Sequence, residues 1–130
     1  MSGRVVHFEI PADDMDRAAE FYRTAFGWDI RPMPEMDYVM LMPTPVTEEG
    51  MPAEAGSING GMFQRDAKLA HPVVMIDVAD IDEVLEQVAS LGGSTTLPKQ
   101  AVGGMGFAAY FTDSEGNLMG LWQNAQPESA

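Results

Sequence analysis

The chain of 130 residues lacks cysteine, and it has seven basic residues against twenty acidic ones. Without cysteine it has no disulfide, no thiolate nucleophile and no zinc–thiolate site. The formal net charge of −13 repels phosphate backbones and anionic lipid surfaces, which argues against nucleic acid and membrane as partners. No stretch approaches the ~18 apolar residues of a membrane helix, and the first residues lack the apolar run of a signal peptide. These absences predict a cytoplasmic protein.

The sequence does contain an internal repeat. Residues 66 positions apart are identical at six places, which are Ile10 and Ile76, Asp14 and Asp80, Asp16 and Asp82, Glu20 and Glu86, Gly27 and Gly93, and Pro32 and Pro98. At the ends of the two copies, residues 56–60 resemble residues 116–120 at an offset of 60. A repeat of this length indicates a fold built from two similar modules, with any binding site where the modules face each other.

Each copy has the pattern of a strand, a helix and three further strands. Alternating apolar residues precede each helix, the helices start at an aspartate cap (Asp13 or Asp14, and Asp80), and glycines end them. The order β-α-β-β-β occurs twice, which predicts an α+β fold. Module one is expected over residues 4–64 and module two over residues 71–124. Together they would form one domain of residues 1–124, followed by a frayed tail at 125–130.

Three segments carry a resemblance to a known family. They are His7-Phe8-Glu9-Ile10, the helix end Phe21-Tyr22 with Phe26-Gly27-Trp28, and the turn Tyr110-Phe111-Thr112-Asp113-Ser114-Glu115-Gly116-Asn117. The pattern resembles the vicinal oxygen chelate superfamily, which holds glyoxalase I, extradiol dioxygenases and bleomycin resistance proteins. Within it, the chain is most similar to small bacterial glyoxalase-like proteins. The resemblance implies that the two βαβββ modules form a curved, cup-shaped mixed sheet with the helices outside.

Strand alternation then predicts which side chains point into the cup. His7 and Glu9 are the candidate catalytic residues. The candidate ligand-binding residues are Tyr38, Met40, Gly60, Met62, Val73, Met75, Gly120 and Trp122. An apolar or aromatic ligand would lie between Trp122 and the side of Met40 and Met62, with a cationic or hydrogen-bonding end toward Glu9. The alternative for Glu9 is an ion pair with Arg4 or Arg31.

The resemblance also implies where a metal would bind. Metal enzymes of the superfamily use four cup-facing side chains, and the corresponding positions here are His7, Gly60, Val73 and Gly120. Only one of the four can ligate a metal, so no cofactor is expected. A divalent metal held by His7, Glu9 and His71 is the minority alternative.

Three functions remain open at this point. The first is a metal-free protein that binds a small organic molecule in the cup. The second is a glyoxalase-like lyase, isomerase or dioxygenase-type enzyme with an atypical site at Glu9 and His7. The third is a structural dimer without a ligand. Because eight curved strands leave exposed edges, a homodimer is expected in each case.

Overall fold

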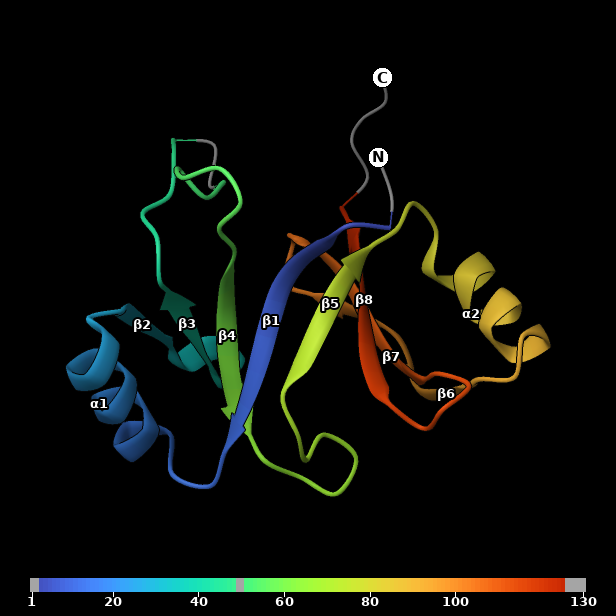
Figure 1. Ribbon diagram of the computed structural model, residues 1–130, viewed down its shortest axis with the longest axis horizontal. Coiled ribbons are helices and arrows are strands. Elements are labelled where there is room, and N and C mark those ends of the chain that lie inside the picture. Colours follow the sequence, from blue (N-terminus) through green and yellow to red (C-terminus); the bar gives the residue numbers. More distant parts are fainter. Residues whose placement is uncertain (1–2, 49–50, 126–130) are drawn as a thin grey trace. The chain divides into compact units, whose positions relative to one another are not determined.

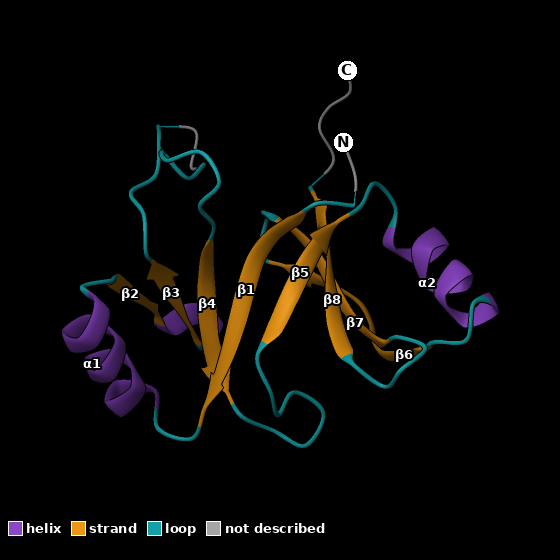
Figure 2. Ribbon diagram, in the orientation of Figure 1, coloured by secondary structure: helices purple, strands orange, loops and turns teal. Residues whose placement is uncertain are grey.

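The computed structural model describes residues 3–48 and 51–125, and it divides the chain into two compact units. The N-terminal unit is His7–Pro72, and the C-terminal unit is Val73–Ala130 together with Met1–Val6. Figure 1 follows the chain through both units, and Figure 2 shows that each contains strands and one longer helix. The predicted tail at 125–130 falls, from residue 126 on, outside the described residues.

The N-terminal unit is a four-stranded mixed sheet with one α-helix. Its elements are β1 (Val5–Ala12), α1 (Met15–Phe26), β2 (Asp29–Met33), the short 3-10 helix η1 (Pro34–Met36), β3 (Tyr38–Met42) and β4 (Asn59–Gln64). The strand order is β2-β3-β4-β1; β1 is parallel to β4, and β3 is antiparallel to both of its neighbours.

The C-terminal unit repeats this arrangement. Its elements are β5 (Val73–Asp77), α2 (Ile81–Ser90), β6 (Ser94–Val102), β7 (Gly106–Thr112) and β8 (Leu118–Asn124). Their order is β5-β8-β7-β6, with β5 parallel to β8 and the other pairs antiparallel. Arg4 also belongs to this unit, because the Asp77 backbone N–H donates to the Arg4 carbonyl at 2.8 Å. The predicted α+β fold of two βαβββ modules is therefore confirmed.

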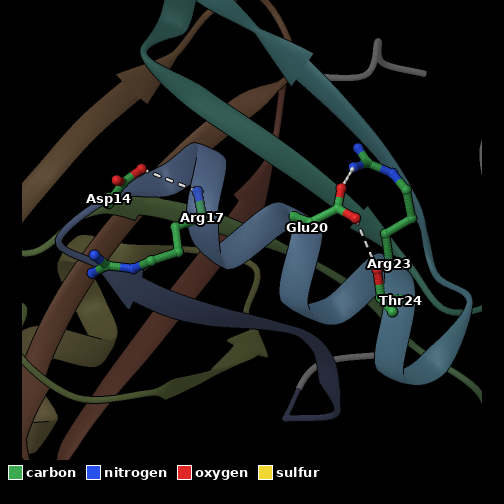
Figure 3. Close-up of polar contacts among 5 residues, drawn as sticks. All are labelled: Asp14, Arg17, Glu20, Arg23 and Thr24. Carbon is green, nitrogen blue, oxygen red and sulfur yellow. Dashed lines mark hydrogen bonds and ion pairs between the residues drawn. The ribbon is translucent and has the colours of Figure 1, made fainter.

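Both α-helices start at the aspartate that the sequence predicts. The Asp14 carboxylate accepts a hydrogen bond from the Arg17 backbone N–H at 3.0 Å (Figure 3), and the Asp80 carboxylate accepts one from the Glu83 N–H at 3.2 Å. Each bond satisfies one of the amides that a helix leaves unpaired at its start. At the end of α1, Gly27 takes a left-handed conformation with φ of 74°, which a residue with a side chain rarely adopts.

Each helix packs on one face of its own sheet and forms a core there. The core under α1 consists of Ala12, Ala19, Ile30, Val39, Leu41 and Met62. The core under α2 consists of Val78, Ile81, Ala109, Phe111 and Leu121. Because side chains of a strand alternate between faces, the residues between these core positions lie on the opposite face, here called the helix-distal face of each sheet. No helix within residues 3–48 and 51–125 is long and apolar enough to cross a membrane.

Candidate functional site

The helix-distal face of the N-terminal unit carries the polar side chains that the sequence singles out. In β1, Phe8 and Ile10 pack against the core under α1, so His7 and Glu9 point the other way. In β3, Val39 and Leu41 belong to the same core, which places Tyr38 and Met40 on the helix-distal face. The predicted orientation of these four residues is confirmed.

A chain of hydrogen bonds joins three of these residues. The Tyr38 hydroxyl donates to Glu9 Oε2 at 2.8 Å and lies 3.0 Å from His7 Nε2. A tyrosine hydroxyl has one proton, and here it goes to the carboxylate, so His7 Nε2 must donate to the Tyr38 oxygen. Glu9 is buried, with 7% of its surface exposed. The network supplies a buried carboxylate with a hydrogen-bond donor, which reduces the cost of holding it out of water.

Burial also sets the protonation state of His7. Loss of solvent around the imidazole lowers the pKa of His7 from 6.5 to about 4. The ring is therefore neutral at pH 7, with its proton on Nε2 and an unprotonated Nδ1. A neutral imidazole in this position can accept a hydrogen bond through Nδ1 from a bound molecule.

We expect this shift to make the protein less stable in mild acid. Because the folded pKa lies below the unfolded one, the unfolded chain binds more protons between pH 6.5 and 4, so stability falls as the pH falls through that window. The full contribution of His7 is up to about 3 kcal/mol. Urea unfolding of the wild type and of His7→Asn at several pH values measures it. The variant His71→Asn is the control, because His71 is exposed and is the other histidine of the chain. A pH dependence that persists in His7→Asn and disappears in His71→Asn would contradict this assignment.

Two local features hold Tyr38 in place. Asp37 ends η1 in a left-handed conformation with φ of 53°, and its backbone N–H donates to the Pro34 carbonyl at 3.1 Å. This turn reverses the chain and starts β3 at Tyr38. Below the ring lies Gly61 of β4, paired with Glu9 on one side and Met40 on the other. A Cβ atom at Gly61 would overlap the Tyr38 hydroxyl and ring, so glycine is what allows the ring to lie over the strand.

The helix-distal face of the C-terminal unit is mostly apolar. Val73, Met75, Gly120 and Trp122 lie on it, as the sequence predicts, because Ile76 and Leu121 face the core under α2. A Cβ atom at Gly120 would overlap the Met75 sulfur, so the thioether already fills the space above this glycine. Val73 and Met75 are buried and Trp122 is partly exposed. The Trp122 indole N–H donates to Asn124 Oδ1 at 2.8 Å.

The predicted orientation of Gly60 and Met62 is wrong. Gly60 pairs with Phe8 and Met62 with Ile10, so both point toward α1. Met62 is fully buried in the core under the helix, and a Cβ atom at Gly60 would lie 2.6 Å from the Phe8 ring. The cause is the repeat offset of 60, which aligns Gly60 with Gly120. The register instead aligns Gly61 with Gly120, and a one-residue slip in a strand moves every side chain to the other face.

The residues do not form a metal site of the superfamily's type. Across residues 3–48 and 51–125, no three side chains among histidine, aspartate and glutamate come together as a metal-binding group, so His71 does not join His7 and Glu9 in one. His71 is exposed in the segment before β5. Gly61 and Gly120 have no donor atom, and His7 Nε2 is engaged by Tyr38. A single imidazole makes a poor metal site.

The Tyr38 hydroxyl donates to Glu9, a contact that the sequence does not assign. Arg31, one of the two arginines expected to pair with Glu9, binds Asp29 at 2.8 Å on β2. The sequence predicts Tyr38 as a ligand contact but gives no sign that it links His7 to Glu9, because these residues are about thirty positions apart. A signal for Gly61 does exist: Gly61-Met62-Phe63-Gln64 resembles Gly120-Leu121-Trp122-Gln123 at an offset of 59.

Comparisons with known proteins agree with this architecture. Residues 4–42 match the model of the family described as bleomycin resistance protein-like N-terminal. A methylmalonyl-CoA epimerase from Streptomyces coelicolor, solved with 2-nitronate-propionyl-CoA, has a TM-score of 0.65 and 18% identity over 97% of this chain and 100% of the epimerase chain. A hypothetical protein from Bacillus halodurans has a TM-score of 0.62 and 12% identity over 100% of both chains.

A methylmalonyl-CoA epimerase from Mycobacterium tuberculosis gives a TM-score of 0.57 and 16% identity over 93% of this chain and 87% of that one. No sequence among the curated proteins matches the chain significantly. The fold and the match over residues 4–42 confirm the predicted resemblance to the vicinal oxygen chelate superfamily. The structural likenesses are below 25% identity and carry the fold alone.

Proposed function

We propose that the protein binds a small organic molecule on the helix-distal face of the N-terminal unit, without a metal ion. The observation that carries this proposal is the buried Glu9 carboxylate, bonded to Tyr38 on a face whose other members, His7, Tyr38 and Met40, are partly exposed. Burying a charged group is unfavourable, so buried charged groups occur preferentially at functional sites.

The chemistry of these side chains defines the class of ligand. Glu9 favours a cationic or hydrogen-bond-donating end, and the unprotonated Nδ1 of His7 accepts a second hydrogen bond. Met40 and the Tyr38 ring suit a flat or flexible apolar body, since a thioether adapts to irregular shapes and a ring offers a stacking surface. In the C-terminal unit, Trp122 with Val73, Met75 and Gly120 remains proposed as a further apolar surface.

A fragment screen by thermal shift tests this proposal. Fragments with an amine or amidine on an aromatic body are expected to raise the melting temperature of the wild type but not of Glu9→Gln. The glutamine keeps the size of the side chain and an acceptor for Tyr38 while it removes the charge. Gly104→Ala is the matched control, because a Cβ atom there meets nothing within 4 Å. Fragments that stabilise Glu9→Gln as much as the wild type would contradict the proposal.

Proton abstraction next to a carbonyl group is the second candidate function. Tyr38 favours it, because its hydroxyl lies beside Glu9 and supplies the donor that a metal-free enzyme needs for a developing oxyanion. Glu9 would take the carbon-bound proton while Tyr38 donates to the carbonyl oxygen. The epimerases of the same fold suggest the assay: deuterium uptake by methylmalonyl-CoA in D2O, followed by NMR with divalent ions removed. Exchange no faster with wild type than with Glu9→Gln would rule this function out.

We also propose that the protein is a homodimer, as the strand edges suggest. A dimer that binds no fragment and catalyses no exchange would leave the non-catalytic structural role as the remaining function.

A further inference from the structure

We infer that helix α1 is the contact surface for a second copy of this chain, packed antiparallel against α1 of the first. The inference rests on the proposed homodimer and adds which surface forms it. Two features lie along this one helix: an exposed aromatic cluster that reaches Phe26 at its end, and a groove beside its first turns, with Phe21 and Tyr22 shared by both. In an antiparallel pair of identical helices, the start of each helix lies beside the end of the other.

The aromatic cluster is large and rigid. Phe21 is 60% exposed and Phe26 62% exposed, with ring centroids 6.5 Å apart. The Tyr22 ring stacks on Trp28 at 5.0 Å, and Phe26 lies 5.9 Å from Trp28. The rings are therefore fixed by one another before any partner arrives, so little conformational entropy is lost on contact. Exposed aromatic groups gathered in this way mark an interaction surface more often than scattered apolar residues do.

The groove lies beside the first turns of the same helix. It has a volume of about 340 Å³, and its lining includes Ile10, Asp14, Arg17, Ala18, Phe21 and Arg65. A space of this size takes a small apolar group. In an antiparallel pair, Phe26 of one copy reaches the groove of the other, and Phe21 lies near the two-fold axis, because α1 has 12 residues and runs from Met15 to Phe26.

The distribution of charged residues also favours α1 as the contact surface. The chain carries a net charge of −13, and two copies repel each other over most of their surface. Within α1, however, Asp16 and Glu20 balance Arg17 and Arg23. Helix α2, in contrast, has three acidic residues (Asp82, Glu83 and Glu86) and no basic one.

Among the basic residues of α1, the Arg17 side chain is the one available to a partner. The Glu20 carboxylate binds Arg23 at 3.2 Å and the Thr24 hydroxyl at 2.9 Å, and the Arg17 side chain points away from both Glu20 and the Asp14 carboxylate (Figure 3). In an antiparallel pair this arginine, near the start of α1, lies beside the negative end of the partner helix dipole. The antiparallel arrangement also opposes the two helix dipoles favourably.

Sedimentation equilibrium at micromolar concentration tests the inference. We expect the wild type to have twice the mass of the 14.1 kDa chain. The variants Phe21→Glu and Phe26→Glu are each expected to weaken the dimer at least about tenfold, because each loses a buried aromatic side chain and adds a negative charge. Leu91→Glu is the matched control, since Leu91 is 76% exposed and follows α2. It should leave the dissociation constant unchanged.

The outcomes distinguish two claims, that the protein is a dimer and that α1 forms the contact. A wild type that stays a monomer contradicts both the homodimer and its surface. A dimer that both α1 variants retain contradicts the α1 surface alone, and a dimer lost in Leu91→Glu but kept in the α1 variants assigns the contact to α2. Circular dichroism of each variant shows whether it is folded, and neither Phe21 nor Phe26 is among the core residues under α1 or the side chains packed against them.

Discussion

Replacing Gly61 by alanine is expected to lower the free energy of unfolding by about 2–4 kcal/mol, although it adds a single methyl group. The added Cβ atom would overlap the Tyr38 ring and hydroxyl, so the ring must leave its position over β4. Its hydrogen bonds to Glu9 and His7 are then lost. Breaking a bond to a buried carboxylate costs more than breaking one at the surface, because water does not replace the lost donor there.

Urea unfolding measures this effect, with Gly104→Ala as the control. Both substitutions are chemically identical, and Gly104 has open space where its Cβ would go. Its free energy of unfolding should change by less than about 0.5 kcal/mol. The pKa of His7 in Gly61→Ala, followed by NMR, should move from about 4 back toward 6.5 as the ring gains solvent. Equal stability of the two alanine variants would show that Tyr38 does not occupy this place.

Replacing Met62 by alanine is expected to lower the free energy of unfolding by about 2–5 kcal/mol, the usual effect of truncating a large buried side chain. Met62 has no exposed surface and packs with Ala19, Val39 and Leu41 under α1. Fragment binding should survive in this variant, because the side chain points away from Glu9. Met40→Ala should show the opposite result, with a small loss of stability and weakened binding.

This pair of variants decides the register of β4, which fixes the composition of the candidate site. Met105→Ala is the surface control, because Met105 is 51% exposed and lies outside both cores. Calorimetry or urea unfolding provides the stabilities, and the thermal-shift assay provides the binding. A Met62→Ala protein as stable as Met105→Ala would return Met62 to the face of Glu9, where the sequence pattern first places it.

Local signals in the sequence predict much of this fold. An aspartate before an apolar helical stripe predicts the caps at Asp14 and Asp80, because a short carboxylate there bonds the free amides of the first turn. Alternation in β1 predicts that His7 and Glu9 share a face, since a strand has a period of two residues. The repeat predicts the same topology in both units.

The register between strands depends on contacts that the sequence does not display. Gly60 and Gly61 are neighbours, and offsets of 60 and 59 in the sequence align one or the other with Gly120; the pairing of Glu9 with Gly61 decides between them. Strand β6 gives a second example. It continues through Pro98 to Val102, because proline is tolerated in a strand at the end of the sheet order whose pairing is irregular between Leu97 and Gln100. The network of His7, Tyr38 and Glu9 likewise requires the tertiary fold.

The most direct test of the proposed ligand site is an NMR titration of protein labelled at the methionine methyl groups. A fragment from the screen is added, and the signals of Met40 and Met62 are compared. Both belong to the N-terminal sheet, but they lie on opposite faces of it. Binding beside Glu9 predicts that the Met40 signal shifts with fragment concentration, that the Met62 signal stays in place, and that Glu9→Gln abolishes the shift. A saturable shift of Met62 with Met40 unchanged would contradict the site.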